Sequence, residues 1–187
     1  MNPDLLLFRL INGVAGTVPL LDAVMRFLAN DYVIPTALAA TLVFLWFSRD
    51  ERLQQAVIRA GLALLLANGI VKLINLIWYR PRPFTYHDVH LLFYFPSDSS
   101  FPANSAAAMF ALAGTIWLVD RPAGSWMLLA GATMALARVY VGVHYPFDVL
   151  GGAAIGIVSA MALQRLSPYL RPLAVGLARL SRRLGLA

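Results

Sequence analysis

The sequence contains no cysteine, and few of its residues are charged. The absence of cysteine excludes disulfides, thiolate metal sites, iron–sulfur clusters and cysteine nucleophiles, and it is compatible with any redox compartment. Only 13% of the 187 residues are charged, whereas 60% are hydrophobic. A soluble domain has about 25% charged residues. The composition therefore argues against a soluble enzyme, a disordered chain and a nucleic-acid-binding module, and it predicts an all-α integral membrane protein with short loops.

Apolar stretches divide residues 1–187, taken as a single membrane-embedded domain, into predicted transmembrane helices. A spanning helix needs about 20 apolar residues, so the chain has room for a bundle of about six. The first is the weakest, because Arg9, Asp22 and Arg26 interrupt it, and it is expected to be partly interfacial. Residues 84–100 form the longest non-helical stretch, and a basic C-terminal tail covers about 165–187. The predicted spans are 4–28, 32–48, 53–79, 102–119, 124–142 and 147–164.

The few cations are distributed unevenly between the two membrane sides. Lys72 is the only lysine, and the other fourteen cations are arginines. One side carries only Arg80, Arg82 and the nearby Arg138, so the positive-inside rule predicts that the other side and both termini are cytoplasmic. Contact of the tail with anionic membrane lipids then explains much of the net charge of +6 without nucleic acid as a partner. The arginines of the cytoplasmic side are Arg49, Arg52, Arg121, Arg165, Arg171, Arg179, Arg182 and Arg183.

Most polar residues in or beside the spans fall at the opposite, outer ends. They come from three separated stretches of chain. Charges in or near a bilayer are costly and are usually functional. Cations, a histidine and an aspartate that converge on one face would hold an anion. The residues are Lys72, Asn75, Arg80, Arg82, Asp98, Ser99, Ser100, Asn104, Ser105, Arg138, His144 and Asp148.

The stretch around His144 favours nucleophilic chemistry. Pro146 suits the first position of a helix, which places Asp148 in the first turn and His144 just before it. A carboxylate there can accept the Nδ1 proton and leave Nε2 free to attack phosphorus. The alternative is an aspartate that answers the helix dipole, with His144 as an ordinary loop residue.

The other two stretches offer phosphate ligands with structural alternatives. Free N–H groups at the start of the 102–119 helix attract phosphate, although the serines before it are also natural caps. Arg80 and Arg82 present forks that suit phosphate oxygens or an interfacial anchor. Lys72 lies about two turns deeper, where snorkelling to the surface is the alternative. His87 and His90 have no third strong ligand near them, so no metal site is predicted.

Together these stretches resemble the type 2 phosphatidic acid phosphatase superfamily, which shares its site with vanadium haloperoxidases. That family has a Lys…Arg-Pro element, a Pro-Ser-Gly-His element and an Arg-x5-His-x3-Asp element. Arg138, His144 and Asp148 match the third residue for residue, and the resemblance covers about 72–152. The Arg-Pro-Arg-Pro-Phe and Ser-Phe-Pro runs are most similar to bacterial undecaprenyl-diphosphate phosphatases of the bacitracin-resistance type.

Two positions depart from the family pattern. Counting seven residues back from Arg82 gives Asn75 where the family has lysine, and Lys72 lies one turn before it. Ser105 occupies the position of the general-acid histidine, and the loss of such an acid typically costs about 10²–10⁴-fold in rate. Either Ser105 is an engineered, inactivating substitution, or the chain is a natural homologue whose acid is His87 or His90, or which no longer catalyses.

The resemblance implies a hydrolase that converts a lipid phosphate, most closely undecaprenyl diphosphate, to its dephosphorylated product through a phosphohistidine. His144 would be the nucleophile, Asp148 would orient it, and an acid at position 105 would protonate the leaving group. The implied location is the bacterial inner membrane with the site on the periplasmic side, and no cofactor or metal is implied. The alternative is a protein that binds or translocates lipid phosphates without cleaving them. The implied phosphate ligands are Arg82, Arg138, Lys72, Asn75, Arg80, Ser100, Ala103 and Asn104.

Overall fold

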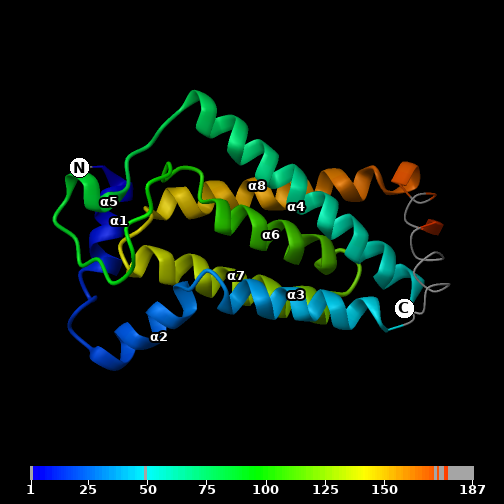
Figure 1. Cartoon of the computed structure of the whole chain (residues 1–187), viewed down its shortest axis with the longest axis horizontal. Coiled ribbons are helices and arrows are strands. Elements are labelled where there is room, and N and C mark those ends of the chain that lie inside the picture. Colours follow the sequence, from blue (N-terminus) through cyan, green and yellow to red (C-terminus); the bar gives the residue numbers. More distant parts are fainter. Residues whose placement is uncertain (1, 49, 171, 173–174, 177–187) are drawn as a thin grey trace.

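The computed structural model describes residues 2–48, 50–170, 172 and 175–176, and it contains no β-strand in this part of the chain. The predicted all-α fold is confirmed. The long helices run side by side along one axis, while α1, α5 and the connection after α5 gather at one end (Figure 1). The helices are α1 (Pro3–Asn12), α2 (Pro19–Ala29), α3 (Val33–Trp46), α4 (Glu51–Ile77), α5 (Pro83–Tyr86), α6 (Asn104–Trp117), α7 (Arg121–Tyr140) and α8 (Pro146–Arg165).

Several helices are long and apolar enough to cross a membrane. The 27-residue α4 and the 20-residue α8 each qualify alone, and α2 with α3 forms a third candidate that bends by 49°. The chain is therefore a multi-pass membrane protein, although the structure does not bear out a count of six separate spans. Most of the predicted basic tail, and Arg49, lie outside the described residues.

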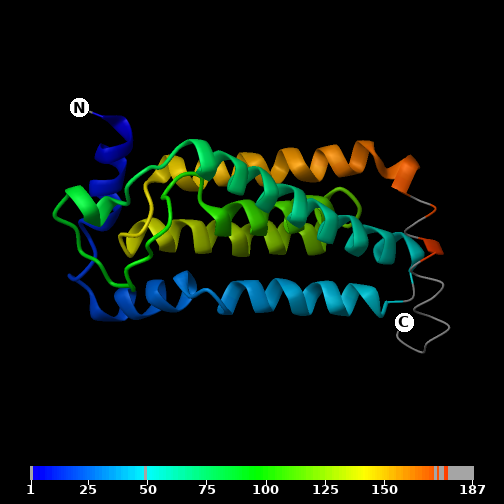
Figure 2. The same ribbon diagram turned by 45° about the horizontal axis from the view of Figure 1, so that its top comes forward.

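The first predicted span, residues 4–28, is wrong. The helix ends at Asn12, Gly16 adopts a left-handed backbone with φ of 82°, and Pro19 starts α2. A non-glycine residue would be strained at Gly16, so the sequence itself encodes the break. As a result α1 lies across one end of the bundle (Figure 2). The described chain begins at that end and α8 finishes at the other (Figure 1), and the predicted cytoplasmic placement of both termini stays a prediction.

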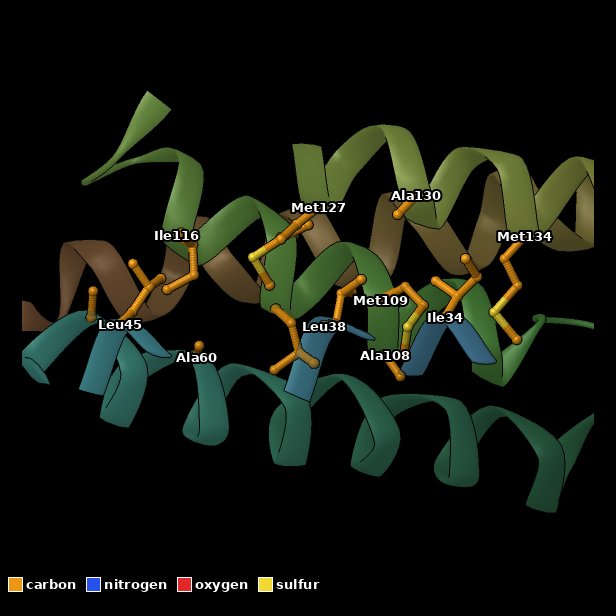
Figure 3. Packing of buried hydrophobic residues seen from close by; sticks show 13 residues of the cluster. Ile34, Leu38, Leu45, Ala60, Ala108, Met109, Ile116, Met127, Ala130 and Met134 are labelled. Atoms are coloured by element: carbon orange, nitrogen blue, oxygen red, sulfur yellow. The ribbon is translucent and has the colours of Figure 1, made fainter. Parts of the chain in front are cut away.

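The main core lies where α3, α4, α6 and α7 meet (Figure 3). Leu38, Met127 and Met134 are almost fully buried there, and ten of the fourteen residues of α6 are buried. The central position of α6 makes it the scaffold against which the other helices are placed.

Glycines on α8 allow it to approach α6 very closely. A Cβ at Gly152 would lie 2.3 Å from the carbonyl oxygen of Ala103, and one at Gly156 would lie 2.5 Å from that of Ala107. Small residues at a helix–helix contact let the backbones of membrane helices approach closely. This contact fixes the register of the two helices and brings the start of α8 against the start of α6, where the Ala103 amide donates to the Asp148 carbonyl at 2.9 Å.

Candidate active site

The three polar stretches meet in one cavity of about 260 Å³ at the end of the bundle that carries α1 and α5. Arg82 comes from the start of α5, Ser105 from the first turn of α6, and His144 from the loop between α7 and α8. The sequence therefore correctly predicts that these distant segments converge. The cavity is lined by Asp31, Pro35, Arg82, Tyr94, Pro96, Asp98, Asn104, Ser105, Met109, Met134, Arg138 and His144.

Buried His144 is held in one tautomer by the backbone. Its Nδ1 lies 3.0 Å from the carbonyl oxygen of Ser100. A carbonyl can only accept, so Nδ1 carries the proton and Nε2 keeps its lone pair. Nε2 lies 3.3 Å from Nη1 of Arg82, which donates to it at the cavity wall. The predicted Nδ1 hydrogen bond to Asp148 is replaced by this carbonyl contact, because the nearest carboxylate oxygen is 3.8 Å from Nδ1.

The surroundings of His144 favour its neutral form. Burial lowers the pKa of the imidazole below its usual value, and the positive charges of Arg82 and Arg138 lower it further, against the opposing effect of Asp148. The ring is therefore neutral near pH 7, and the lone pair of its unprotonated Nε2 accepts the hydrogen bond from Arg82.

Asp148 is fully buried and accepts hydrogen bonds from three directions. Its carboxylate receives Arg80 Nη1 at 2.6 Å, the Ser100 hydroxyl at 2.5 Å and the Tyr145 amide at 2.8 Å. The Tyr145 contact caps α8, so Asp148 also has the role at the start of the helix that the sequence offered as the alternative. Capping and the Arg80 contact together fix the carboxylate beside the His144 ring.

Arg80 binds carboxylates rather than facing the cavity. Its Nη2 donates to Asp4 at 2.7 Å, and its guanidinium lies 4.3 Å above the centre of the Tyr145 ring. Asp4 in turn accepts the Phe147 amide at 2.9 Å. Arg80 thus joins α1 to the start of α8, and its geometry does not fit the predicted phosphate contact.

Two further predicted phosphate ligands also lie behind the cavity wall. The Ser100 side chain and carbonyl are used by Asp148 and His144, respectively. The Ala103 amide already donates to the Asp148 carbonyl. Neither Ser100 nor Ala103 lines the cavity, and their polar groups hold the two residues of the His–Asp element in place.

Arg82 and Arg138 are the cations that do line the cavity, and each is paired with a carboxylate. Arg82 donates to the Val143 carbonyl and to the Asp98 carboxylate, both at 2.8 Å. Arg138 pairs with Asp31, and its buried Nε has no hydrogen-bond partner. The side chains of Asp98 and Asp31 are 65% and 40% exposed, whereas those of the two arginines are 5% exposed, so an incoming anion would have to take the place of each carboxylate on its arginine.

The other predicted residues fall into three places. Asn104 and Ser105 lie in the first turn of α6, whose N–H groups have no helical acceptor. His87 packs edge-on against the Tyr145 ring, and neither it nor the exposed His90 lines the cavity. Lys72 and Asn75 line a second cavity, of about 360 Å³, which shares Asp98 and Asn104 with the first.

Sequence reasoning missed three residues that complete the site. Asp4 holds Arg80, Asp31 holds Arg138, and Tyr94 donates its hydroxyl to Asp31 at 2.8 Å. Asp4 and Asp31 are acidic residues beside predicted spans, which is the signal that could have marked them. Their partners are distant in sequence, so the pairing itself leaves no local pattern.

A family model, that of the PAP2 superfamily, matches residues 56–172. The chain belongs to the PAP2 superfamily. The undecaprenyl-diphosphatase BcrC of Bacillus subtilis (strain 168) is 31% identical over 166 residues, 89% of this chain and 85% of that protein. The putative undecaprenyl-diphosphatase YbjG of Escherichia coli (strain K12) is 29% identical over 87% of this chain and 82% of its own length. Among solved PAP2-like folds, Aquifex aeolicus LpxE superposes with a TM-score of 0.68 at 31% identity, covering 86% of this chain and 94% of that one.

Proposed function

We propose that the chain is a lipid phosphate phosphatase whose substrate is undecaprenyl diphosphate, the compound in the names of two relatives. The observation that carries the proposal is the state of His144. Its Nδ1 proton is fixed on the Ser100 carbonyl, and its Nε2 lies beside Arg82 in a cavity that also holds Arg138. A neutral, oriented imidazole between two guanidinium groups is suited to attack a phosphate.

In the proposed reaction the terminal phosphate takes the place of Asp98 and Asp31 on the two arginines. Nε2 of His144 attacks the terminal phosphorus in line. An N–P bond forms as the bond from phosphorus to the bridging oxygen breaks, and the lipid phosphate leaves with that electron pair. Water then attacks the phosphohistidine, which releases inorganic phosphate and restores neutral His144.

Charge placement supplies most of the proposed catalysis. Phosphoryl transfer depends mainly on positioning and on stabilising the charge of the transferring group. Arg82 and Arg138 would stabilise that charge, with help from the amides in the first turn of α6. As the imidazole becomes cationic, the Asp148 carboxylate 3.8 Å from Nδ1 would stabilise it.

Ser105 limits this chemistry. A serine hydroxyl has no proton that is released near neutral pH, so it cannot replace a histidine acid. The other histidines do not line the cavity. We therefore expect the chain to be slower than a form with histidine at position 105, by roughly 10²–10⁴-fold on substrates whose leaving group needs a proton.

The proposed membrane placement rests on the positions of the arginines at the two ends of the bundle. The far end of the bundle carries Arg52, Arg121 and Arg165, which the positive-inside rule assigns to the cytoplasm. The cavity end would then face the periplasm of a bacterial inner membrane. The lipid chain stays in the bilayer, and only the headgroup reaches the cavity.

Phosphate release from undecaprenyl diphosphate in detergent micelles tests the proposal. His144→Ala should abolish release, whereas His90→Ala, which changes an exposed histidine outside the cavity, should not. Ser105→His should raise phosphate release from phosphatidic acid, whose alcohol leaving group needs a proton, far more than from undecaprenyl diphosphate. A Ser105→His protein that is inert on undecaprenyl diphosphate, phosphatidic acid and phosphatidylglycerol phosphate would show that hydrolysis is not the function.

Ser105 also favours a second candidate function, in which the cavity binds lipid phosphates and moves them across the membrane without cleavage. A flipping assay in vesicles, with a fluorescent lipid phosphate as the probe, tests it directly. Transport that persists in the His144→Ala protein would support this candidate, because translocation needs no nucleophile.

A further inference from the structure

The second cavity lies on the flank of α4, and two residues separate it from the reaction cavity. Its polar lining consists of Asn68, Lys72 and Asn75 from α4, together with Asp98 and Asn104, which also line the first cavity. The two cavities are therefore adjacent, and a headgroup with two phosphates that lies across Asp98 and Asn104 would place one phosphate in each.

The polar residues of this cavity lie on a flank of α4 whose neighbouring residues are apolar. Asn68, Lys72 and Asn75 are spaced by four and three residues, so they share one face of α4. Nearby Leu73 and Ile77 are 65% and 87% exposed, which marks this flank as facing lipid. Polar and charged groups in such surroundings are expensive and mark binding sites.

The same polar groups have few partners within the protein. Lys72 forms no ion pair with any described residue. Among the described residues, the buried Oδ1 atoms of Asn68 and Asn75 have no hydrogen-bond partner, and their N–H₂ groups donate to no acceptor. One cation and two free amides form a suitable set of donors for a phosphate.

Leaving-group chemistry links this cavity to Ser105. Cleavage of a diphosphate releases a phosphomonoester, whose second pKa is about 6, so the leaving oxygen needs no proton at neutral pH. Cleavage of a lipid monophosphate releases an alkoxide, whose parent alcohol is about as weak an acid as water, so the leaving oxygen needs a proton. A site without a histidine acid at position 105 can therefore cleave the first class far more readily than the second.

Resting on the proposed function, we infer that the second cavity binds the phosphate that stays on the lipid, and that the chain is selective for lipid diphosphates over lipid monophosphates. Lys72 pairs with the retained phosphate, and Asn75 and Asn104 donate hydrogen bonds to it. The terminal phosphate then lies against Arg82 and His144, while the hydrocarbon chain leaves the cavity past exposed Leu76.

Binding to a catalytically inert protein tests this inference independently of hydrolysis. The His144→Ala protein is titrated with farnesyl diphosphate and with farnesyl monophosphate in detergent. The diphosphate should bind at least about tenfold more tightly, since only its retained phosphate forms a charge-assisted contact with Lys72. Adding Lys72→Met should remove most of this difference, whereas adding Leu73→Met on the neighbouring lipid-facing position should preserve it.

Equal affinities for the two lipids, or a diphosphate preference that Lys72→Met leaves intact, would overturn the inference. Phosphate release by the protein with His144 intact is measured alongside. Suppose that the protein with His144 intact releases phosphate from neither lipid, while the His144→Ala protein still prefers the diphosphate. The proposed hydrolysis is then wrong, and the assignment of the second cavity to a diphosphate is supported. Release at similar kcat/KM from both lipids would contradict the selectivity.

Discussion

Replacing the two arginines of the Arg-Pro-Arg-Pro run should affect different properties of the protein, namely stability for one and phosphate release for the other. Arg80 lies between the buried carboxylates of Asp4 and Asp148, whereas Arg82 faces the cavity and pairs with a carboxylate that is 65% exposed. Arg80→Gln should therefore lower stability strongly, and Arg82→Gln should chiefly abolish phosphate release.

The magnitude follows from the contacts that each variant loses. Arg80 makes two charge-assisted hydrogen bonds, at 2.6 and 2.7 Å, to side chains that are 0% and 3% exposed. Removing one partner of a buried ion pair costs about 3–5 kcal/mol, because the remaining charge is left uncompensated. Arg82 loses a contact to an exposed carboxylate, for which about 0–1 kcal/mol is typical, and one buried hydrogen bond to the Val143 carbonyl, which adds about 1–3 kcal/mol. The stability loss should therefore be smaller than for Arg80→Gln, which leaves two buried carboxylates unpaired.

Unfolding of the detergent-solubilised variants, followed by circular dichroism during titration with SDS, measures this difference. Asp4→Asn in the Arg80→Gln background should recover part of the lost stability, since it removes one of the two unpaired carboxylates. Comparable stability of Arg80→Gln and the unchanged chain, together with activity loss equal to that of Arg82→Gln, would refute the structural role of Arg80 and restore it as a phosphate ligand.

Two further predictions concern titration and packing. Because the pKa of buried His144 is lowered, the folded state binds fewer protons than the unfolded state below the unfolded value of about 6.5. Stability should therefore fall as pH drops below about 6.5, by about 1.4 kcal/mol for each unit that separates the pKa of His144 in the folded and unfolded states. The His144→Gln protein should show a weaker pH dependence when SDS titrations at pH 8 and pH 5 are compared. Gly156→Ala, whose Cβ would lie 2.5 Å from the Ala107 carbonyl, should lose roughly 1–3 kcal/mol of stability. Gly61→Ala, with no atom within 4 Å of the added Cβ, should be neutral or stabilising.

Each of these has a clear contrary outcome. A pH dependence that is the same with His144 and with glutamine in its place would show that this ring does not set it. Equal stabilities of the Gly156→Ala and Gly61→Ala proteins would show that the α6–α8 contact is looser than the structure has it.

Apolar runs and proline punctuation explain why most of the bundle could be predicted from the sequence. The stretch predicted over 53–79 is α4 at Glu51–Ile77, and that over 147–164 is α8 at Pro146–Arg165. The family motif likewise identified Arg82, Arg138 and His144, which line one cavity. Local hydropathy and motif spacing suffice for these features because each is encoded in consecutive or nearly consecutive residues.

Features that depend on distant partners were not predictable. Arg80 and Arg82 look equivalent in the sequence, and only the fold shows that one meets Asp4, 76 residues away, while the other meets the cavity. The acceptor for His144 Nδ1 is a backbone carbonyl, which any residue type supplies. The helix break before Pro19 was missed because the apolar composition continues across it.

The proposed phosphohistidine offers the most direct test of the mechanism. The chain is mixed with farnesyl diphosphate carrying ³²P in the terminal phosphate, quenched in alkali within the first turnover, and digested for mass spectrometry of the labelled peptide. The label should lie on His144, should be stable in alkali and lost in acid, and should be absent from the His144→Ala protein. Rapid phosphate release without any protein-bound label, or a label that persists after His144→Ala, would contradict nucleophilic attack by this residue.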